Sequence, residues 1–163
     1  MKILCCDVDG VLTDGTLRLG EGGEFKSFHI LDGFGLRVLQ GQGIRVAWVS
    51  SRPSTATQRR ADELQVDFLH QARGSKVAAV ETILDRAELR WEDAAFLGDD
   101  LVDLGPMKRA GLALAVPNAV AEVRQVAHYV TRLAGGQGAV REVAEMILRA
   151  QGRWRRVVEE FSA

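Results

Sequence analysis

Short apolar runs alternate with segments of helical character along most of this 163-residue chain, and this alternation constrains the fold more than any other feature. Compact apolar runs typical of buried strands lie at residues 2–8, 44–49, 66–69, 94–97, 112–116 and 129–131. Segments with helical spacing or helix-boundary residues lie at 32–42, 53–64, 75–89, 101–110, 119–127 and 138–151. Elements of these lengths in this order predict an α/β fold, a doubly wound, Rossmann-like parallel sheet with helices on both faces.

One segment near the N-terminus departs from the alternation. Residues 16–19 and 25–30 flank the glycine-rich turn Gly20-Glu21-Gly22-Gly23 and predict a β-hairpin, which we call the flap (about residues 14–31). The sequence has no repeat, linker or low-complexity stretch, so we expect one domain over residues 1–163. A C-terminal tail, about residues 152–163, either extends the last helix or docks elsewhere.

The composition is that of an ordinary globular protein. A net charge of −1 gives no bulk attraction for nucleic acid or anionic lipid, so neither partner is expected. No apolar stretch approaches the ~20 residues of a membrane helix, and the N-terminus does not read as a signal peptide. The cytoplasm is therefore the expected compartment. Cys5 and Cys6 are adjacent in a predicted strand, which excludes a framework disulfide between them and favours a core role.

Two carboxylates, Asp7 and Asp9, follow the first apolar run. Residues i and i+2 of a strand project from the same face, so both carboxylates are expected to point from the carboxyl end of the strand, where open α/β sheets bind ligands. Like charges this close repel unless a cation or a proton lies between them. The pair therefore favours a hard metal ion, with one carboxylate free to attack an electrophile. A turn followed by a helix cap is the alternative.

Other polar groups stand at or after further strands. These are Ser50-Ser51-Arg52, Lys76, and Gly98-Asp99-Asp100 with Asp103. In a doubly wound sheet they converge on one crevice. Carboxylates, a hydroxyl and a lysine together suit phosphoryl transfer, in which Ser50 and Lys76 bind phosphate oxygens. Taken singly, Ser50 could cap the next helix, Lys76 could be solvated, and the aspartates could form a turn. Their joint order along the chain carries the prediction.

These residues resemble the haloacid dehalogenase superfamily of phosphatases over nearly the whole chain. The four matching motifs are Asp7–Gly15 (DVDGVLTDG), Ser50, Lys76 and Gly98–Asp103 (GDDLVD). The resemblance implies that Asp7 is a nucleophile that forms a phospho-aspartate and that Asp9 is the general acid and base. It also implies Mg²⁺, bound by the carboxylates of Asp7 and Asp99 and the backbone carbonyl of Asp9. Asp100 and Asp103 would orient Asp99 or Lys76.

Three further segments resemble a capless family within this superfamily, the 3-deoxy-D-manno-octulosonate 8-phosphate (KDO 8-phosphate) phosphatases of lipopolysaccharide biosynthesis. They are Phe28–Gly35, Gly98–Leu104, and Tyr129–Arg132 followed by Ala134–Glu142. The resemblance implies a homotetramer in which flaps meet around an axis and a neighbouring subunit covers each active site in place of a cap domain. It also implies contacts to a sugar-acid phosphate from Asp9, His29, Ile30, Leu31, Asp32, Gly33, Arg37, Ser51, Arg52, Arg60 and Lys76.

Several alternatives remain open from the sequence. Leu31 and Ser51 depart from residues common in the family, and so do Ala72 and Gly74 before Lys76, which leaves a nine-carbon, sialic-acid-type sugar phosphate as another substrate. Arg37 and Arg60 could instead lie on solvated helix faces. A receiver-type signalling domain also combines carboxylates, a hydroxyl and a lysine, but its phosphorylated aspartate follows a middle strand, where this chain has Ser50. An idle assembly module is disfavoured because no motif residue is missing.

Overall fold

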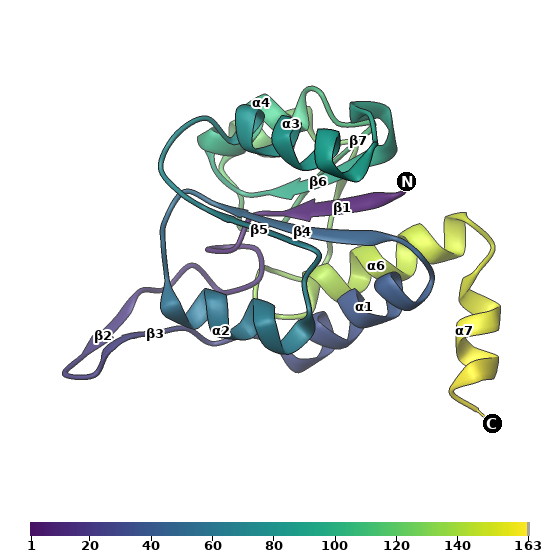
Figure 1. Cartoon of the computed structure of the whole chain (residues 1–163), viewed down its shortest axis with the longest axis horizontal. Coiled ribbons are helices and arrows are strands. Elements are labelled where there is room, and N and C mark those ends of the chain that lie inside the picture. The colour runs from purple at the N-terminus through teal and green to yellow at the C-terminus, as the bar shows by residue number, and fades with distance from the viewer. Residues whose placement is uncertain (163) are drawn as a thin grey trace.

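A six-stranded parallel sheet forms the centre of the computed structural model, which describes residues 1–162 (Figure 1). The strand order is β5-β4-β1-β6-β7-β8, and all neighbouring pairs are parallel. The bounds are β1 Ile3–Cys6, β4 Arg45–Ser50, β5 Phe68–Gln71, β6 Ala94–Gly98, β7 Leu112–Ala115 and β8 Tyr129–Val130. The chain order reverses direction at β1, so the ends of β1, β4 and β6 flank the crevice where such sheets bind ligands.

Helices cover both faces of this sheet. Figure 1 shows α3 and α4 on one face and α1, α2 and α6 on the other. The bounds are α1 Ile30–Gly41, α2 Thr55–Leu64, α3 Lys76–Ala87, α4 Leu104–Met107, α5 Ala121–Val126, α6 Ala139–Ala150 and α7 Trp154–Glu160, with short 3₁₀ turns at Trp91–Asp93 and Leu101–Asp103. The predicted doubly wound α/β class is confirmed. No helix within residues 1–162 is long and apolar enough to cross a membrane.

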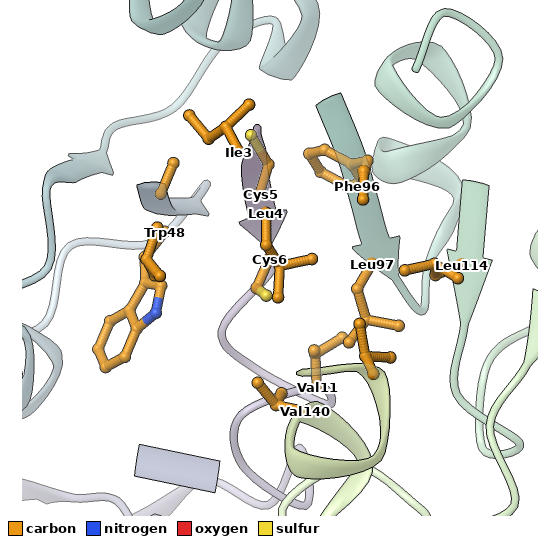
Figure 2. Packing of buried hydrophobic residues seen from close by; sticks show 14 of the residues in the cluster. Ile3, Leu4, Cys5, Cys6, Val11, Trp48, Phe96, Leu97, Leu114 and Val140 are labelled. Carbon is orange, nitrogen blue, oxygen red and sulfur yellow. The ribbon is translucent and has the colours of Figure 1, made fainter. Parts of the chain in front are cut away.

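The central strands β1 and β6 are buried along their whole length because helices cover both of their faces. Every residue of β1 is buried, including Cys5 and Cys6, which are free thiols. Figure 2 shows Trp48 of β4 on one side of β1 and Phe96, Leu97 and Leu114 of β6 and β7 on the other. Burial raises the pKa of the Cys5 thiol to about 12, so this cysteine is a neutral core residue.

The flap is a two-stranded antiparallel hairpin, β2 Arg18–Gly20 and β3 Gly23–Phe25, that projects from the body of the molecule (Figure 1). The second strand of the hairpin was predicted over Phe25–Ile30, and this was wrong for every residue after Phe25. Pairing stops at Phe25 and α1 already begins at Ile30, two residues before the predicted start. The reason is His29, whose Nδ1 accepts a hydrogen bond from Leu31 N at 3.2 Å and so caps the helix.

Two other predicted elements differ near the C-terminal half. The predicted helix at residues 101–110 is a 3₁₀ turn followed by the short helix α4. The tail forms a separate helix, α7, after Gly152. Its Trp154 lies under the guanidinium groups of Arg141 and Arg149, and Phe161 meets Phe34 edge to face. Of the two predicted alternatives for the tail, the second is therefore confirmed: residues 152–162 do not extend α6 but pack against α1 and α6.

Candidate active site

The loop after β1 carries the first acidic residues of the site. Asp7 N donates to Leu97 O at 3.0 Å, and the chain then turns, with Leu12 N donating to Val8 O at 2.9 Å. The first strand was predicted to run to Val8, which was wrong, because β1 ends at Cys6. Asp9 therefore lies in a turn, and its carboxylate is directed to partners different from those of Asp7.

Lys76, the first residue of α3, lies between two carboxylates. Its Nζ is 2.7 Å from Asp7 Oδ1 and 2.7 Å from Asp103 Oδ1, and its side chain is 3% exposed. Burial works against the charge of Lys76, but the charges of Asp7 and Asp103 outweigh burial and raise its pKa. Lys76 is therefore a buried cation held at the carboxyl end of the sheet and is not the solvated lysine of the alternative.

Asp103 holds the loop after β6 in place. Its Oδ2 accepts hydrogen bonds from Asp99 N at 3.0 Å and Asp100 N at 3.2 Å, while its Oδ1 binds Lys76. Asp100 accepts from Leu101 N at 2.7 Å and caps the following 3₁₀ turn. Of the two predicted orienting residues, Asp103 is thus tied to both Asp99 and Lys76, and Asp100 caps the turn.

Three carboxylates crowd one spot. Single oxygens of Asp7, Asp99 and Asp103 lie within 4.8 Å of one another. Burial is the main cause that raises the pKa of both Asp7 and Asp99, and the neighbouring carboxylates raise both further. Asp99 Oδ1 is buried without a hydrogen-bond partner among residues 1–162. Since Asp103 is occupied by Lys76 and two amides, Asp7 and Asp99 are the oxygen donors that fit a hard cation such as Mg²⁺.

Gly10 allows this crowding. Its φ is +94°, a backbone conformation that side chains disfavour, and a Cβ built at Gly10 would lie 2.0 Å from Asp99 Oδ2. A second loop clasps Gly10 from the other side: Asn118 Nδ2 donates to Gly10 O at 2.9 Å, and Asn118 Oδ1 accepts from Gly135 N at 2.8 Å. The glycine-rich segment of the C-terminal signature therefore packs against the loop that follows β1. Asn118 was not among the predicted site residues, since a single asparagine in a loop gives no local signal.

Ser50 ends β4 and is buried. Its Oγ accepts from Arg52 N and donates to Arg52 O, each at 3.1 Å, which fixes the turn at Ser51. The cap of α2 is instead Ser54, which accepts from Thr57 N. Ser50 is therefore not the helix cap that the alternative proposed.

The flap reaches the acidic loop of its own chain. Lys26 Nζ lies 2.6 Å from Asp9 Oδ1, and Arg52 Nε lies 3.6 Å from Asp9 Oδ2. Glu24 anchors the flap, because it accepts from Arg52 Nη1 at 2.5 Å and from Ser54 Oγ at 2.8 Å. Neither Lys26 nor Glu24 was a predicted site residue, since a lysine and a glutamate on a hairpin give no local signal.

Several predicted substrate contacts are engaged with the protein itself. Asp32 is buried and accepts from Gly138 N at 3.3 Å and Arg141 N at 2.8 Å, which ties α1 to the start of α6. Arg37 donates to Leu64 O at 3.2 Å, at the end of α2. Arg60 packs against Gly33 and pairs with Glu63 at 2.8 Å. Ile30 and Leu31 are exposed on the first turn of α1, next to the helix cap His29.

Comparisons with known proteins identify the class. Residues 69–143 match a family described as haloacid dehalogenase-like hydrolase. The KDO 8-phosphate phosphatase of Yersinia pestis is 40% identical over 154 residues, which cover 94% of this chain and 82% of that protein. The Escherichia coli K12 enzyme of the same name is 39% identical with the same coverage.

Solved structures agree with this class. The crystal structure of the KDO 8-phosphate phosphatase from Moraxella catarrhalis, in complex with magnesium, phosphate and KDO, gives a TM-score of 0.96 at 37% identity and covers 99% of this chain and 93% of that one. The cobalt-bound enzyme from Haemophilus influenzae gives a TM-score of 0.90 at 38% identity and covers 93% of this chain and 90% of that one. The magnesium of the first structure agrees with the predicted cofactor.

The chain belongs to the haloacid dehalogenase superfamily, and its class is that of a hydrolytic phosphatase. Within the superfamily it belongs to the KDO 8-phosphate phosphatase family. Both parts of the predicted resemblance are confirmed.

Proposed function

We propose that this chain is a Mg²⁺-dependent phosphatase that hydrolyses KDO 8-phosphate to KDO and inorganic phosphate. The observation that carries the proposal is the crowding of Asp7 and Asp99 beside the buried cation Lys76, in a chain of this family. Two carboxylates at this depth repel each other even beside one lysine, and a bound divalent cation would offset that repulsion.

Asp7 is the nucleophile of the proposed reaction. Its carboxylate oxygen attacks phosphorus, the ester bond to the sugar oxygen breaks, and Asp9 gives a proton to that oxygen as it leaves. A water molecule then attacks the phosphorus of phospho-Asp7 and its proton passes to Asp9, which restores both aspartates and releases phosphate. Mg²⁺ held by the carboxylates of Asp7 and Asp99, with the backbone carbonyl of Asp9 as the proposed third ligand, would supply charge compensation and polarise a phosphate oxygen.

Lys76 and Ser50 are the proposed phosphate-binding side chains. Lys76 Nζ lies 2.7 Å from Asp7 Oδ1, so a phosphoryl group on Asp7 would lie beside an ammonium group that is already in place. Ser50 lies at the end of the neighbouring strand β4, with its hydroxyl turned toward Arg52. A pre-placed donor such as Lys76 favours the charge of the transition state at no cost of reorganisation, whereas the Ser50 hydroxyl would have to turn from Arg52 O to a phosphate oxygen.

Arg52 is the proposed recognition residue for the carboxylate of the sugar acid. It follows Ser50 at the crevice edge, its side chain is 43% exposed, and its guanidinium lies beside Asp9. A guanidinium binds a carboxylate through two parallel hydrogen bonds, which suits a substrate that carries an acid group besides its phosphate. The other predicted contacts to the substrate, from residues 29–33 and from Arg37, Ser51 and Arg60, stay predictions.

We further propose that the chain acts as one domain and assembles as a homotetramer through its flap. Leu19 and Phe25 of the flap are 75% and 57% exposed, and Leu17 beside them is 50% exposed. Apolar side chains on a thin hairpin are typical of surfaces that partner subunits cover. Sedimentation of an active wild-type monomer at assay concentration would contradict this part of the proposal.

A panel of phosphate esters, assayed with Mg²⁺ and with EDTA, tests the function. KDO 8-phosphate, a nine-carbon sialic-acid-type phosphate and a neutral sugar phosphate form the informative set. We expect Mg²⁺-dependent phosphate release that is fastest with KDO 8-phosphate and absent in Asp7→Asn, which is expected to remain folded. Equal rates for acidic and neutral sugar phosphates would refute the substrate assignment, and near-normal activity of Asp7→Asn would refute the nucleophile.

A further inference from the structure

Lys26 is the flap residue that enters the active site of its own chain. It follows β3, and its side chain is only 2% exposed although its neighbours Phe25 and Ser27 are exposed on the surface. A lysine is almost never buried without a partner, and this one lies 2.6 Å from Asp9 Oδ1 and 3.6 Å from Glu24 Oε1. The burial of Lys26 is therefore directed at the carboxylate of Asp9.

The two oxygens of Asp9 have different surroundings. Oδ1 accepts the hydrogen bond from Lys26, whereas Oδ2 lies 3.6 Å from Arg52 Nε, beyond hydrogen-bond length. The Asp9 side chain is 31% exposed, so the carboxyl group can meet a substrate. With Oδ1 fixed, Oδ2 is the oxygen that is available to exchange a proton with a leaving group.

The segment that carries Lys26 is itself held in place. Glu24, two residues earlier, binds Arg52 Nη1 and Ser54 Oγ, which belong to the loop between β4 and α2. Phe28, two residues later, stacks on the buried Trp48 with ring centroids 6.0 Å apart. Lys26 thus sits between two anchors on the body of the molecule, and its ammonium group is positioned by the fold.

We propose that Lys26 is a positioning residue for proton transfer: it holds Oδ1 of Asp9 so that Oδ2 faces the oxygen of the leaving group. This inference rests on the proposed function, because it requires Asp9 to protonate the departing sugar oxygen. Geometry of this kind matters since a proton transfer needs donor and acceptor within hydrogen-bond reach. The ammonium group acts through Asp9, without touching the reacting atoms.

The test compares two leaving groups. KDO 8-phosphate leaves as an alkoxide that must be protonated, whereas p-nitrophenyl phosphate leaves as a stable phenolate that needs no proton. The quantity to measure is kcat/KM, because it reports steps up to departure of the leaving group. For Lys26→Met we expect a loss on the order of tenfold to a hundredfold with KDO 8-phosphate and under about threefold with p-nitrophenyl phosphate. Lys26→Arg, which keeps a cationic donor, should recover part of the loss.

Lys2→Met is the matched control, since Lys2 is an exposed lysine that pairs with Asp93 at 3.1 Å and precedes β1, at the opposite end of the strand from Asp7 and Asp9. It should leave both kcat/KM values unchanged. Equal losses of Lys26→Met on the two substrates, or no loss on either, would overturn the proposal, and urea unfolding of each variant shows whether the fold is intact. If the wild-type enzyme does not hydrolyse KDO 8-phosphate, the proposed substrate is wrong. The same comparison of Lys26→Met with wild type is then made with an alkyl phosphate that the wild-type enzyme does hydrolyse.

Discussion

Replacing Lys76 by methionine measures how much its buried ammonium group stabilises the fold. Methionine is similar in length but uncharged, so Lys76→Met leaves Asp7 and Asp103 without the ammonium group that now lies 2.7 Å from each. Removing one partner of a buried ion pair costs about 3–5 kcal/mol, because an uncompensated charge stays buried. One lysine serves two carboxylates here, so we expect a loss near the top of this range, about 4–5 kcal/mol.

The measurement is urea unfolding in EDTA at neutral pH, followed by tryptophan fluorescence. Lys2→Met is the control, because Lys2 forms an exposed pair with Asp93 at 3.1 Å, and such surface pairs are worth at most about 1 kcal/mol. Both variants remove one lysine charge, so the difference between their free energies of unfolding reports the effect of burying the Lys76 ion pairs. A Lys76→Met protein within about 1 kcal/mol of wild type would refute the argument that this cation balances the acidic cluster.

Three further predictions concern the same region. Asp99→Asn should not lower the melting temperature in EDTA, since it removes a carboxylate that is crowded by the carboxylates of Asp7 and Asp103. It should abolish the rise in melting temperature that Mg²⁺ causes in wild type, and an equal rise in both proteins would contradict the metal assignment. Gly135→Ala should cost on the order of 1–3 kcal/mol in urea unfolding, because its Cβ would lie 1.8 Å from Gly10 O, whereas Gly41→Ala, with nothing within 4 Å, should not destabilise. Burial, opposed by hydrogen bonds from Arg141 and Gly138, raises the folded pKa of Asp32 above its usual 3.8. Its contribution to stability is therefore present below that pH and is lost as the pH rises through the folded pKa. The stability of wild type relative to Asp32→Asn should fall as the pH is raised from about 4, and a difference that stays constant with pH would refute this.

The sheet and the three site residues Asp7, Lys76 and Asp99 were predictable because both depend on local patterns. Apolar runs locate strands, and the carboxyl ends of parallel strands share one edge of a sheet. Asp7, Lys76 and Asp99 could therefore be placed together although they are far apart in the chain. Element ends were less predictable, since the start of α1 depends on the cap formed by His29 and the turn after β1 begins two residues early.

The contacts that the sequence did not predict are long-range and specific to single side chains. Lys26 reaches Asp9 from a segment that Glu24 and Phe28 hold against the body of the molecule, and no periodicity encodes that docking. Asn118 binds Gly10 across 108 positions, and its partner Gly135 allows the approach by lacking a side chain. Such pairs follow from tertiary packing, which a single sequence does not reveal.

The two aspartates of the motif depend on lysines of different structural origin. Lys76 begins a helix packed on the sheet, so the charge beside Asp7 is fixed by the core of the molecule. Lys26 lies on a hairpin that has no core of its own, and a free two-stranded hairpin is marginally stable. Conditions that loosen the flap should therefore impair the proposed proton transfer by Asp9 before they disturb the cluster of Asp7 and Asp99. If subunit contacts hold the flap, dilution should slow hydrolysis of alkyl phosphates more than that of aryl phosphates, while the affinity for Mg²⁺ stays constant.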